Sequence, residues 1–143
     1  MCIRDRVRDI KGELFSAKII KNSISTDLAL LKTELELRPI TIETKKPKIG
    51  SSACLISNSF GLNIGITCGV ISATGLSNIG FNDIEDFLQT DAAANPGSSG
   101  GALVNLNGEL LCMMSGIFTK NTDTNAGVNF AISSGLISKF LAN

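Results

Sequence analysis

The chain has 143 residues, 43% of them hydrophobic, and its 13 Lys and Arg balance 13 Asp and Glu. This apolar content argues against intrinsic disorder, the zero net charge removes the simplest argument for nucleic acid binding, and no apolar run is long enough to span a membrane. The sequence contains no histidine, which excludes imidazole metal sites and any Ser-His-Asp or Cys-His catalytic set completed within the chain.

Short β-strands are predicted along most of the chain, because segments rich in Ile, Val, Leu and Thr alternate with Gly, Asn and Ser. Many short strands joined by turns imply a barrel or a sandwich. Asn107-Gly108 lies between two apolar pairs and predicts a type I′ hairpin turn, in which both residues have positive φ. The strands are expected at residues 13–21, 27–32, 38–43, 52–57, 66–74, 84–90, 101–105, 109–118 and 127–132.

One helix is expected at the end of the chain, over residues 134–141. Apolar residues repeat at helical spacing from Leu136 to Leu141, and Ser133 or Ser134 can cap the helix N-terminus. The nearest feature to a domain boundary is the polar segment 44–51, where a basic first part of the chain gives way to an acidic second part.

The four cysteines are Cys2, Cys54, Cys68 and Cys112, and none forms a CxxC pair, which argues against a zinc or thioredoxin-type site. A hairpin centred near Gly61 would place Cys54 opposite Cys68, so a disulfide between them is one possibility. The interpretation that we favour is buried free thiols that act as small hydrophobic side chains.

The segment most indicative of function is residues 91–101, Asp-Ala-Ala-Ala-Asn-Pro-Gly-Ser-Ser-Gly-Gly. A flexible Gly/Ser linker is one interpretation, but strand-like apolar segments lie directly before and after it. The alternative is a nucleophile loop, since a serine that attacks a carbonyl must stand on a tight turn whose backbone N–H groups converge on the developing oxyanion. The glycines of Gly97-Ser98-Ser99-Gly100-Gly101 permit such a turn.

Residues 87–105, which contain this loop, resemble the nucleophile region of the HtrA/Deg family of trypsin-like serine endopeptidases. Four further motifs match the family in the correct order, so that the resemblance covers residues 12–141. They are Thr26-Asp27-Leu28-Ala29-Leu30-Leu31 (the strand of the catalytic aspartate), Ser57-Asn58-Ser59-Phe60-Gly61-Leu62 (a Gly-Asn-Pro-Phe-Gly turn), Thr67-Cys68-Gly69-Val70-Ile71-Ser72 (a Thr-Ser-Gly-Ile-Val-Ser strand) and Gly127-Val128-Asn129-Phe130-Ala131-Ile132 (the strand beside the substrate).

The resemblance implies an all-β fold of the chymotrypsin/trypsin-like double β-barrel type. Residues 49–143 would form a nearly complete second barrel, over 49–132, with the nucleophile loop and the short C-terminal helix. Residues 7–48 would be the remnant of a partial first barrel that carries the catalytic aspartate. The strands missing from this first barrel should leave an exposed apolar edge, which is an aggregation hazard.

The resemblance also assigns roles to individual residues. Ser99 would be the nucleophile, because the family's nucleophile directly precedes the Gly-Gly pair, although Ser98 is its rival on sequence alone. The backbone N–H groups of Gly97 and Ser99 would form the oxyanion hole. Asp27, which by itself would be interpreted as a turn residue, would orient a catalytic histidine and stabilise its protonated form.

Substrate recognition is expected from a second group of residues. Ala93 lies six residues before Ser99, where trypsin has the Asp that selects Lys or Arg, and it predicts an apolar specificity pocket. Gly127, Val128 and Asn129 are expected to contact substrate, which would add as a strand beside 127–132. Ser98 departs from the family by replacing an Asn, and Ser59 and Ser133 replace prolines. The sequence shows no chemical role for either Ser59 or Ser133.

The main departure is the missing base, because the family's histidine precedes the aspartate by about thirty residues. We expect the chain to be a fragment of a serine endopeptidase that lacks its N-terminal part and is inactive alone. The alternatives are a non-catalytic, peptide-binding pseudoprotease and an unrelated all-β domain.

No metal or organic cofactor is implied; the expected partner is a peptide or unfolded protein. The family is often extracytoplasmic and oligomeric, but the sequence shows no signal peptide or PDZ domain.

Overall fold

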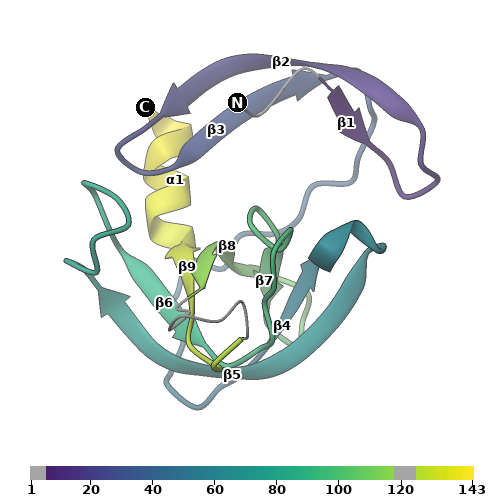
Figure 1. Cartoon of the computed structure of the whole chain (residues 1–143). Helices are drawn as coiled ribbons and strands as arrows, with labels where there is room; N and C mark the ends of the chain where they lie inside the picture. Colours follow the sequence, from purple (N-terminus) through teal and green to yellow (C-terminus); the bar gives the residue numbers. More distant parts are fainter. Residues whose placement is uncertain (1–5, 118–124) are drawn as a thin grey trace.

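A computed structural model describes residues 6–117 and 125–143 of the chain. The first element is an open antiparallel sheet of three strands in the order β1-β2-β3, formed by β1 (Arg6–Arg8), β2 (Leu14–Ser23) and β3 (Leu28–Thr33). Figure 1 shows this sheet lying across the end of a second, closed element, with the C-terminal helix beside both.

The second element is a closed barrel of antiparallel strands in the order β4-β5-β6-β9-β8-β7. The barrel closes because β4 pairs with β5 on one side and with β7 on the other. Its strands and the elements around them are β4 (Ser52–Ser57), the 3₁₀ turn η1 (Ser59–Gly61), β5 (Gly65–Leu76), β6 (Phe87–Thr90), β7 (Ala102–Val104), β8 (Leu110–Ile117), β9 (Asn129–Ser133) and the helix α1 (Ser134–Ala142).

The predicted fold class is therefore confirmed: a mostly β chain with one complete barrel, a partial second sheet and one short helix at its end. All three strands of the open sheet precede residues 44–51, and all barrel strands follow them. The division of the chain into two domains there stays a prediction.

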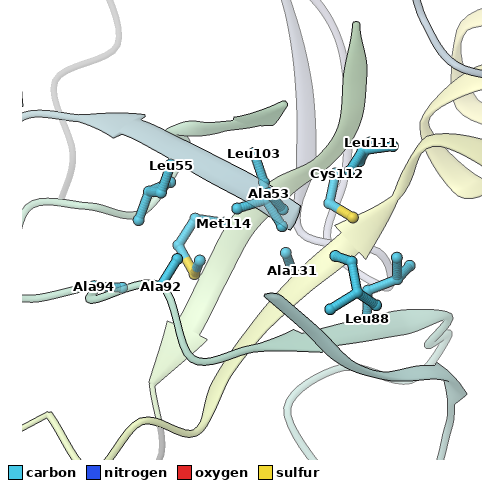
Figure 2. Close-up of a cluster of buried hydrophobic side chains, with 11 residues drawn as sticks. Ala53, Leu55, Leu88, Ala92, Ala94, Leu103, Leu111, Cys112, Met114 and Ala131 are labelled. Carbon is cyan, nitrogen blue, oxygen red and sulfur yellow. The ribbon is translucent and has the colours of Figure 1, made fainter. Parts of the chain in front are cut away.

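Alternation along the barrel strands fills the barrel interior with small and branched apolar side chains. In β4, for example, Ala53 and Leu55 are fully buried inside the barrel, whereas Ser52 at the start of the strand is exposed. Figure 2 shows these side chains pointing toward one another from several strands. The cluster consists of Ala53, Leu55, Ile71, Leu88, Ala92, Ala94, Leu103, Leu111, Cys112, Met114 and Ala131.

A second apolar cluster joins the open sheet and the helix to the barrel. Leu28 at the start of β3 packs with Phe87, Phe130 and Ile132 of the barrel and with Phe140 of α1. Lys21 of β2 strengthens this junction, because its ammonium group donates to the Phe140 carbonyl (2.6 Å) and lies 4.4 Å from the centre of the Phe140 ring. A cation at the C-terminal end of a helix also interacts favourably with the helix dipole.

The helix begins as predicted, because Ser133 is its N-cap and accepts a hydrogen bond from the Leu136 N–H (3.0 Å). The strand predicted over 38–43 is wrong. Only Ile42 forms an isolated bridge there, with Leu110, and Pro39 has no N–H to donate to a ladder. β1 was not predicted, because three residues with two arginines carry no apolar pattern.

The turn at Asn107-Gly108 also differs from the prediction. Gly108 has φ of +79°, but Asn107 is not among the residues with positive φ, so the turn is not of type I′. Instead the Gly108 N–H donates to the Asn105 carbonyl (3.0 Å), and the Asn105 side chain accepts from the N–H groups of Asn107 and Glu109. Asn105 thus stabilises a longer loop, of the kind in which a turn is followed by a left-handed glycine.

The cysteine interpretation needs a correction as well. Cys54 and Cys68 face each other across β4 and β5, with 4.0 Å between their Cα atoms, and form a disulfide rather than two free thiols. Cys112 is the buried free thiol that was expected, and burial raises its pKa well above the ordinary value. Cys2 lies outside the described residues. Among the helices that the structure describes, none has the length and apolar character needed to cross a membrane.

Candidate active site

The loop between β6 and β7, residues 91–101, has a shape that only glycine permits at two points. Gly97 has φ of +95°, and a Cβ atom there would lie 2.6 Å from the Asn58 carbonyl oxygen. At Gly101 a Cβ atom would lie 2.8 Å from the Ile56 carbonyl oxygen. The loop is therefore pressed against the β4 strand and the turn after it, which confirms that it is an ordered turn and not a flexible linker.

Two adjacent serines in this loop have opposite environments. Ser98 is 1% exposed, and its hydroxyl accepts from Ser57 Oγ (3.1 Å) and the Asn95 N–H (3.1 Å) and shares a hydrogen bond with Ser59 Oγ (2.9 Å). Ser99 is exposed. Ser98 thus anchors the loop, and Ser99 is the serine that a reactant can approach. The network also gives Ser59 a structural role that sequence reasoning missed.

Hydrogen bonds to neighbouring carbonyls fix the direction of the Gly97 and Ser99 N–H groups. The Pro96 carbonyl accepts from the Phe60 N–H (2.7 Å), and the Ser98 carbonyl accepts from the Gly101 N–H (2.9 Å). In a trans peptide the N–H points away from the preceding carbonyl, so both N–H groups point away from these contacts. Within the described residues neither N–H has a hydrogen-bond acceptor, and both are available to an incoming anion.

A single residue of β8 connects the Ser99 hydroxyl to an aspartate of the open sheet. Ser99 Oγ donates to the Ser115 carbonyl oxygen (3.1 Å), and Ser115 Oγ donates to Asp27 Oδ2 (3.4 Å). Ser115 carries no local sequence signal beyond being the first polar residue in the apolar run of β8, and sequence reasoning missed it. The structure thus brings Ser99 and Asp27, 72 positions apart in the numbering, to two sides of one residue.

Asp27 occupies an unusual backbone conformation. It has φ of +55° in a turn closed by its N–H to the Ile24 carbonyl (3.3 Å), directly before β3. A non-glycine residue in this region is strained by about 1–2 kcal/mol, and Asp is among the residues that tolerate it best. The exposed carboxylate is thereby directed to Ser115 rather than lying along the strand.

Comparisons with known proteins identify the family to which this arrangement belongs. A family model described as a trypsin-like peptidase domain matches residues 2–113. A probable periplasmic serine endoprotease, DegP-like, of Chlamydia trachomatis is 41% identical over 125 residues, which cover 86% of this chain and 25% of the relative. The chain belongs to the HtrA/Deg family of trypsin-like serine peptidases.

Other HtrA/Deg proteins give the same result. The periplasmic pH-dependent serine endoprotease DegQ of Escherichia coli is 39% identical over 128 residues, covering 87% of this chain and 28% of DegQ. A solved structure of the HtrA-type protease AlgW with a decapeptide has a TM-score of 0.90 and 38% identity, covering 96% of this chain and 42% of AlgW. The chain thus spans about a quarter of the length of the curated relatives it matches.

The residues expected from the sequence to contact substrate lie in different environments, and their roles in substrate binding stay predictions. Ala93 is exposed at the base of the nucleophile loop, and its carbonyl accepts from Thr67 Oγ1 (2.7 Å). Asn129 is fully buried, and its side-chain amide donates to the carbonyls of Thr90 (3.2 Å) and Ala92 (2.9 Å). It thereby holds the first residues of the nucleophile loop in place. Val128 packs into the second apolar cluster.

The expected position of the substrate strand also needs correction. Residues Asn129–Ile132 pair with β6 on one side and with β8 on the other, so the backbone of this strand has no free edge. Gly127 precedes the strand, and its N–H donates to Asn125 Oδ1 (2.7 Å). Gly116 and Ile117 of β8, by contrast, pair only with β9, and Ser115 falls at a register shift in that pairing. Within the described residues no strand occupies the side of 115–117 toward Ser99.

Proposed function

We propose that the chain carries the nucleophile and the aspartate of a serine endopeptidase that cleaves peptide bonds through an acyl-enzyme on Ser99. The observation that carries this proposal is the exposed Ser99 hydroxyl, which donates to the carbonyl of Ser115, the serine that binds Asp27. The N–H groups of Gly97 and Ser99 in the same loop have no acceptor within the described residues. These are the nucleophile, the oxyanion donors and the orienting carboxylate that acyl transfer needs.

The chemistry follows from these positions. Ser99 Oγ attacks the carbonyl carbon of the substrate and loses its proton to a base, while the carbonyl oxygen becomes an oxyanion that accepts from the Gly97 and Ser99 N–H groups. The tetrahedral intermediate expels the amine, which takes the proton from the base. In the second half of the reaction water loses a proton to the base and attacks the acyl-enzyme. The peptide acid then leaves, and Ser99 Oγ recovers its proton from the base. Asp27 would orient the base and stabilise its protonated form.

The base itself is not in these 143 residues, since the sequence contains no histidine. The Ser99 hydroxyl accordingly donates to a backbone carbonyl, which cannot accept its proton in a reaction. In serine proteases, loss of the base costs about six orders of magnitude in rate, or about 8 kcal/mol of transition-state stabilisation. We therefore propose that this chain is inactive alone and that a histidine outside it completes the site.

A substrate peptide would bind in extended form along residues 115–117. Within the described residues no strand occupies this edge of β8, so it offers backbone hydrogen bonds for affinity, and side-chain pockets give selectivity. The residue whose carbonyl is attacked would project toward Ala93, an uncharged residue that suits small or aliphatic side chains. This proposal replaces the edge of 127–132 as the docking position.

The proposed compartment is the periplasm, because the names of the curated relatives describe them as periplasmic. The Cys54–Cys68 disulfide supports this, since disulfides persist in oxidising compartments and are rare in the cytosol. Assembly into a homo-oligomer is part of the same proposal by family resemblance.

A second candidate function is a non-catalytic peptide-binding module, which the absence of histidine favours. Fluorophosphonate labelling of the whole protein, expressed from its complete coding sequence, separates the two. The peptidase proposal predicts rapid labelling at Ser99, cleavage of casein, and loss of both in Ser99→Ala. The isolated 143-residue chain should show neither. A whole protein that lacks a histidine in reach of Ser99 and is not labelled would leave only the binding module.

A further inference from the structure

A phenylalanine lies over the face of β8 at Gly116. An ideal Cβ atom on Gly116 would be 3.4 Å from the Phe81 ring, which is an ordinary van der Waals contact. Gly116 follows Ser115, whose carbonyl accepts from the Ser99 hydroxyl. Because Gly116 has no side chain, the ring covers the space that a larger residue of β8 would fill.

The ring is held firmly on its buried side. Its centroid lies 6.1 Å from that of Phe87 in an edge-to-face arrangement and 5.6 Å from that of Phe130. Both partners are almost completely buried, whereas Phe81 itself is 45% exposed. One part of the ring therefore packs on the core, and the other part is exposed. Aromatic pairs of this geometry add specificity to a contact as well as buried area.

The loop that carries Phe81 is ordered by one carboxylate. Glu85 accepts hydrogen bonds from the backbone N–H groups of Ile79 (2.6 Å), Gly80 (2.9 Å), Phe81 (2.8 Å) and Asn82 (3.0 Å). A second tie joins this loop to the turn of Asp27, since the Ile84 N–H donates to the Ser25 carbonyl (2.9 Å). These hydrogen bonds fix the backbone of the loop that carries Phe81.

We propose that the exposed part of Phe81 is a specificity-determining shelf that selects an apolar side chain in the peptide bound along residues 115–117. It rests on the proposed function, in which the peptide binds along residues 115–117 of β8, and it adds which peptide side chain that site prefers. In antiparallel pairing, residues directly opposite each other project to the same face. The peptide residue opposite Gly116 therefore projects toward Phe81, and it is the neighbour of the residue whose carbonyl Ser99 attacks.

Apolar chemistry is favoured at this position by what surrounds the ring. The shelf consists of the Phe81 ring, with Phe87 and Phe130 behind it, and Gly116 contributes no polar side chain. Leu, Met or Phe in the peptide would lose apolar surface to the ring, whereas Ser or Asp would lose hydration and gain no partner there. A pocket contact of this size discriminates by about tenfold.

Peptide titration of the folded chain tests this proposal. The probes are two acetylated hexapeptides that end in Val with a free carboxylate and carry one Trp at the second residue. They differ only at the fifth residue, the position expected opposite Gly116, which is Leu in one peptide and Ser in the other. The chain contains no Trp or Tyr, so the peptide emission is observed without background. The wild-type chain should bind the Leu peptide about tenfold more tightly than the Ser peptide.

Variants locate the preference on the ring. Phe81→Ala should bring the ratio of the two dissociation constants close to one, and Phe81→Leu should keep most of it. Phe81→Gln, which replaces the ring by a polar side chain of considerable length, serves as a second test if Phe81→Ala is poorly folded. Leu106→Ala is the matched control, because Leu106 is 77% exposed in the turn between β7 and β8, away from the edge.

The outcomes separate the shelf from the docking edge. Binding of both peptides with equal affinity, or a preference that survives Phe81→Ala and Phe81→Gln, overturns the shelf alone. If neither peptide binds, or the amide signals of Gly116 and Ile117 do not shift in a ¹⁵N spectrum on titration, the docking edge is wrong and the shelf falls with it.

Discussion

Gly97 and Gly100 form a matched pair for testing how the nucleophile loop is held. Both have positive φ, +95° and +83°, so alanine at either position is strained by about 1–2 kcal/mol. At Gly100 a Cβ atom meets nothing within 4 Å, whereas at Gly97 it lies 2.6 Å from the Asn58 carbonyl oxygen and 3.1 Å from the Phe60 nitrogen. Backbone atoms cannot rotate away, so Gly97→Ala adds an overpacking cost of about 1–3 kcal/mol.

The free energy of unfolding is therefore expected to fall by about 1–2 kcal/mol in Gly100→Ala and by about 2–5 kcal/mol in Gly97→Ala. Urea unfolding followed by far-ultraviolet circular dichroism measures both, since the chain has no Trp or Tyr for fluorescence. Equal losses in the two variants would refute the close packing of the loop on the turn after β4.

Three further predictions concern the scaffold. The Cys54–Cys68 disulfide closes a loop with a sequence separation of 14, so the Cys54→Ser, Cys68→Ser double variant should lose about 3 kcal/mol in urea unfolding, and an unchanged midpoint would contradict the bond. Burial acts to raise the pKa of Glu85, but its four backbone donors outweigh this and hold the pKa below its ordinary value. The stabilisation is therefore present above the ordinary carboxyl pKa and is lost as pH falls through the lowered pKa. Glu85→Gln should reduce that acid dependence in thermal unfolding, and an identical pH profile would argue against the clamp. Ile20 is 53% exposed on β2 of the open sheet, so Ile20→Lys should slow aggregation in light scattering with little change in stability, and faster aggregation would contradict the role of this sheet.

Local patterns predicted the parts of the fold that depend on neighbouring residues. The hairpin centred on Gly61 has the predicted register, with Cys54 opposite Cys68, because two adjacent strands and their turn define it. The tight turn at Gly97 was predicted for the same reason, since glycines at these positions permit it. Whether two facing cysteines bond depends on how their Cβ atoms approach, which the sequence does not contain.

The parts that failed depend on contacts between distant segments. Substrate was expected to add as a strand beside 127–132, but residues 129–132 pair with β6 on one side and with β8 on the other and leave no free edge. Ser115 was missed because its two partners, Ser99 and Asp27, reach it from different sheets. A strand was expected over 84–90, but it begins at Phe87 because the preceding loop closes around the Glu85 carboxylate instead of continuing the ladder.

The most direct test of the site is the position at which the folded chain accepts an acyl group. Treatment with p-nitrophenyl acetate, followed by mass spectrometry of the peptides, maps acetylation without requiring the missing base. We expect that, among the serines, slow acetylation is selective for Ser99 in the folded chain and is lost in urea. The Ser99 hydroxyl is exposed, and the Gly97 and Ser99 N–H groups of its loop have no acceptor within the described residues. Acetylation at Ser98, or an even distribution over exposed serines, would contradict the assignment of Ser99 as the nucleophile.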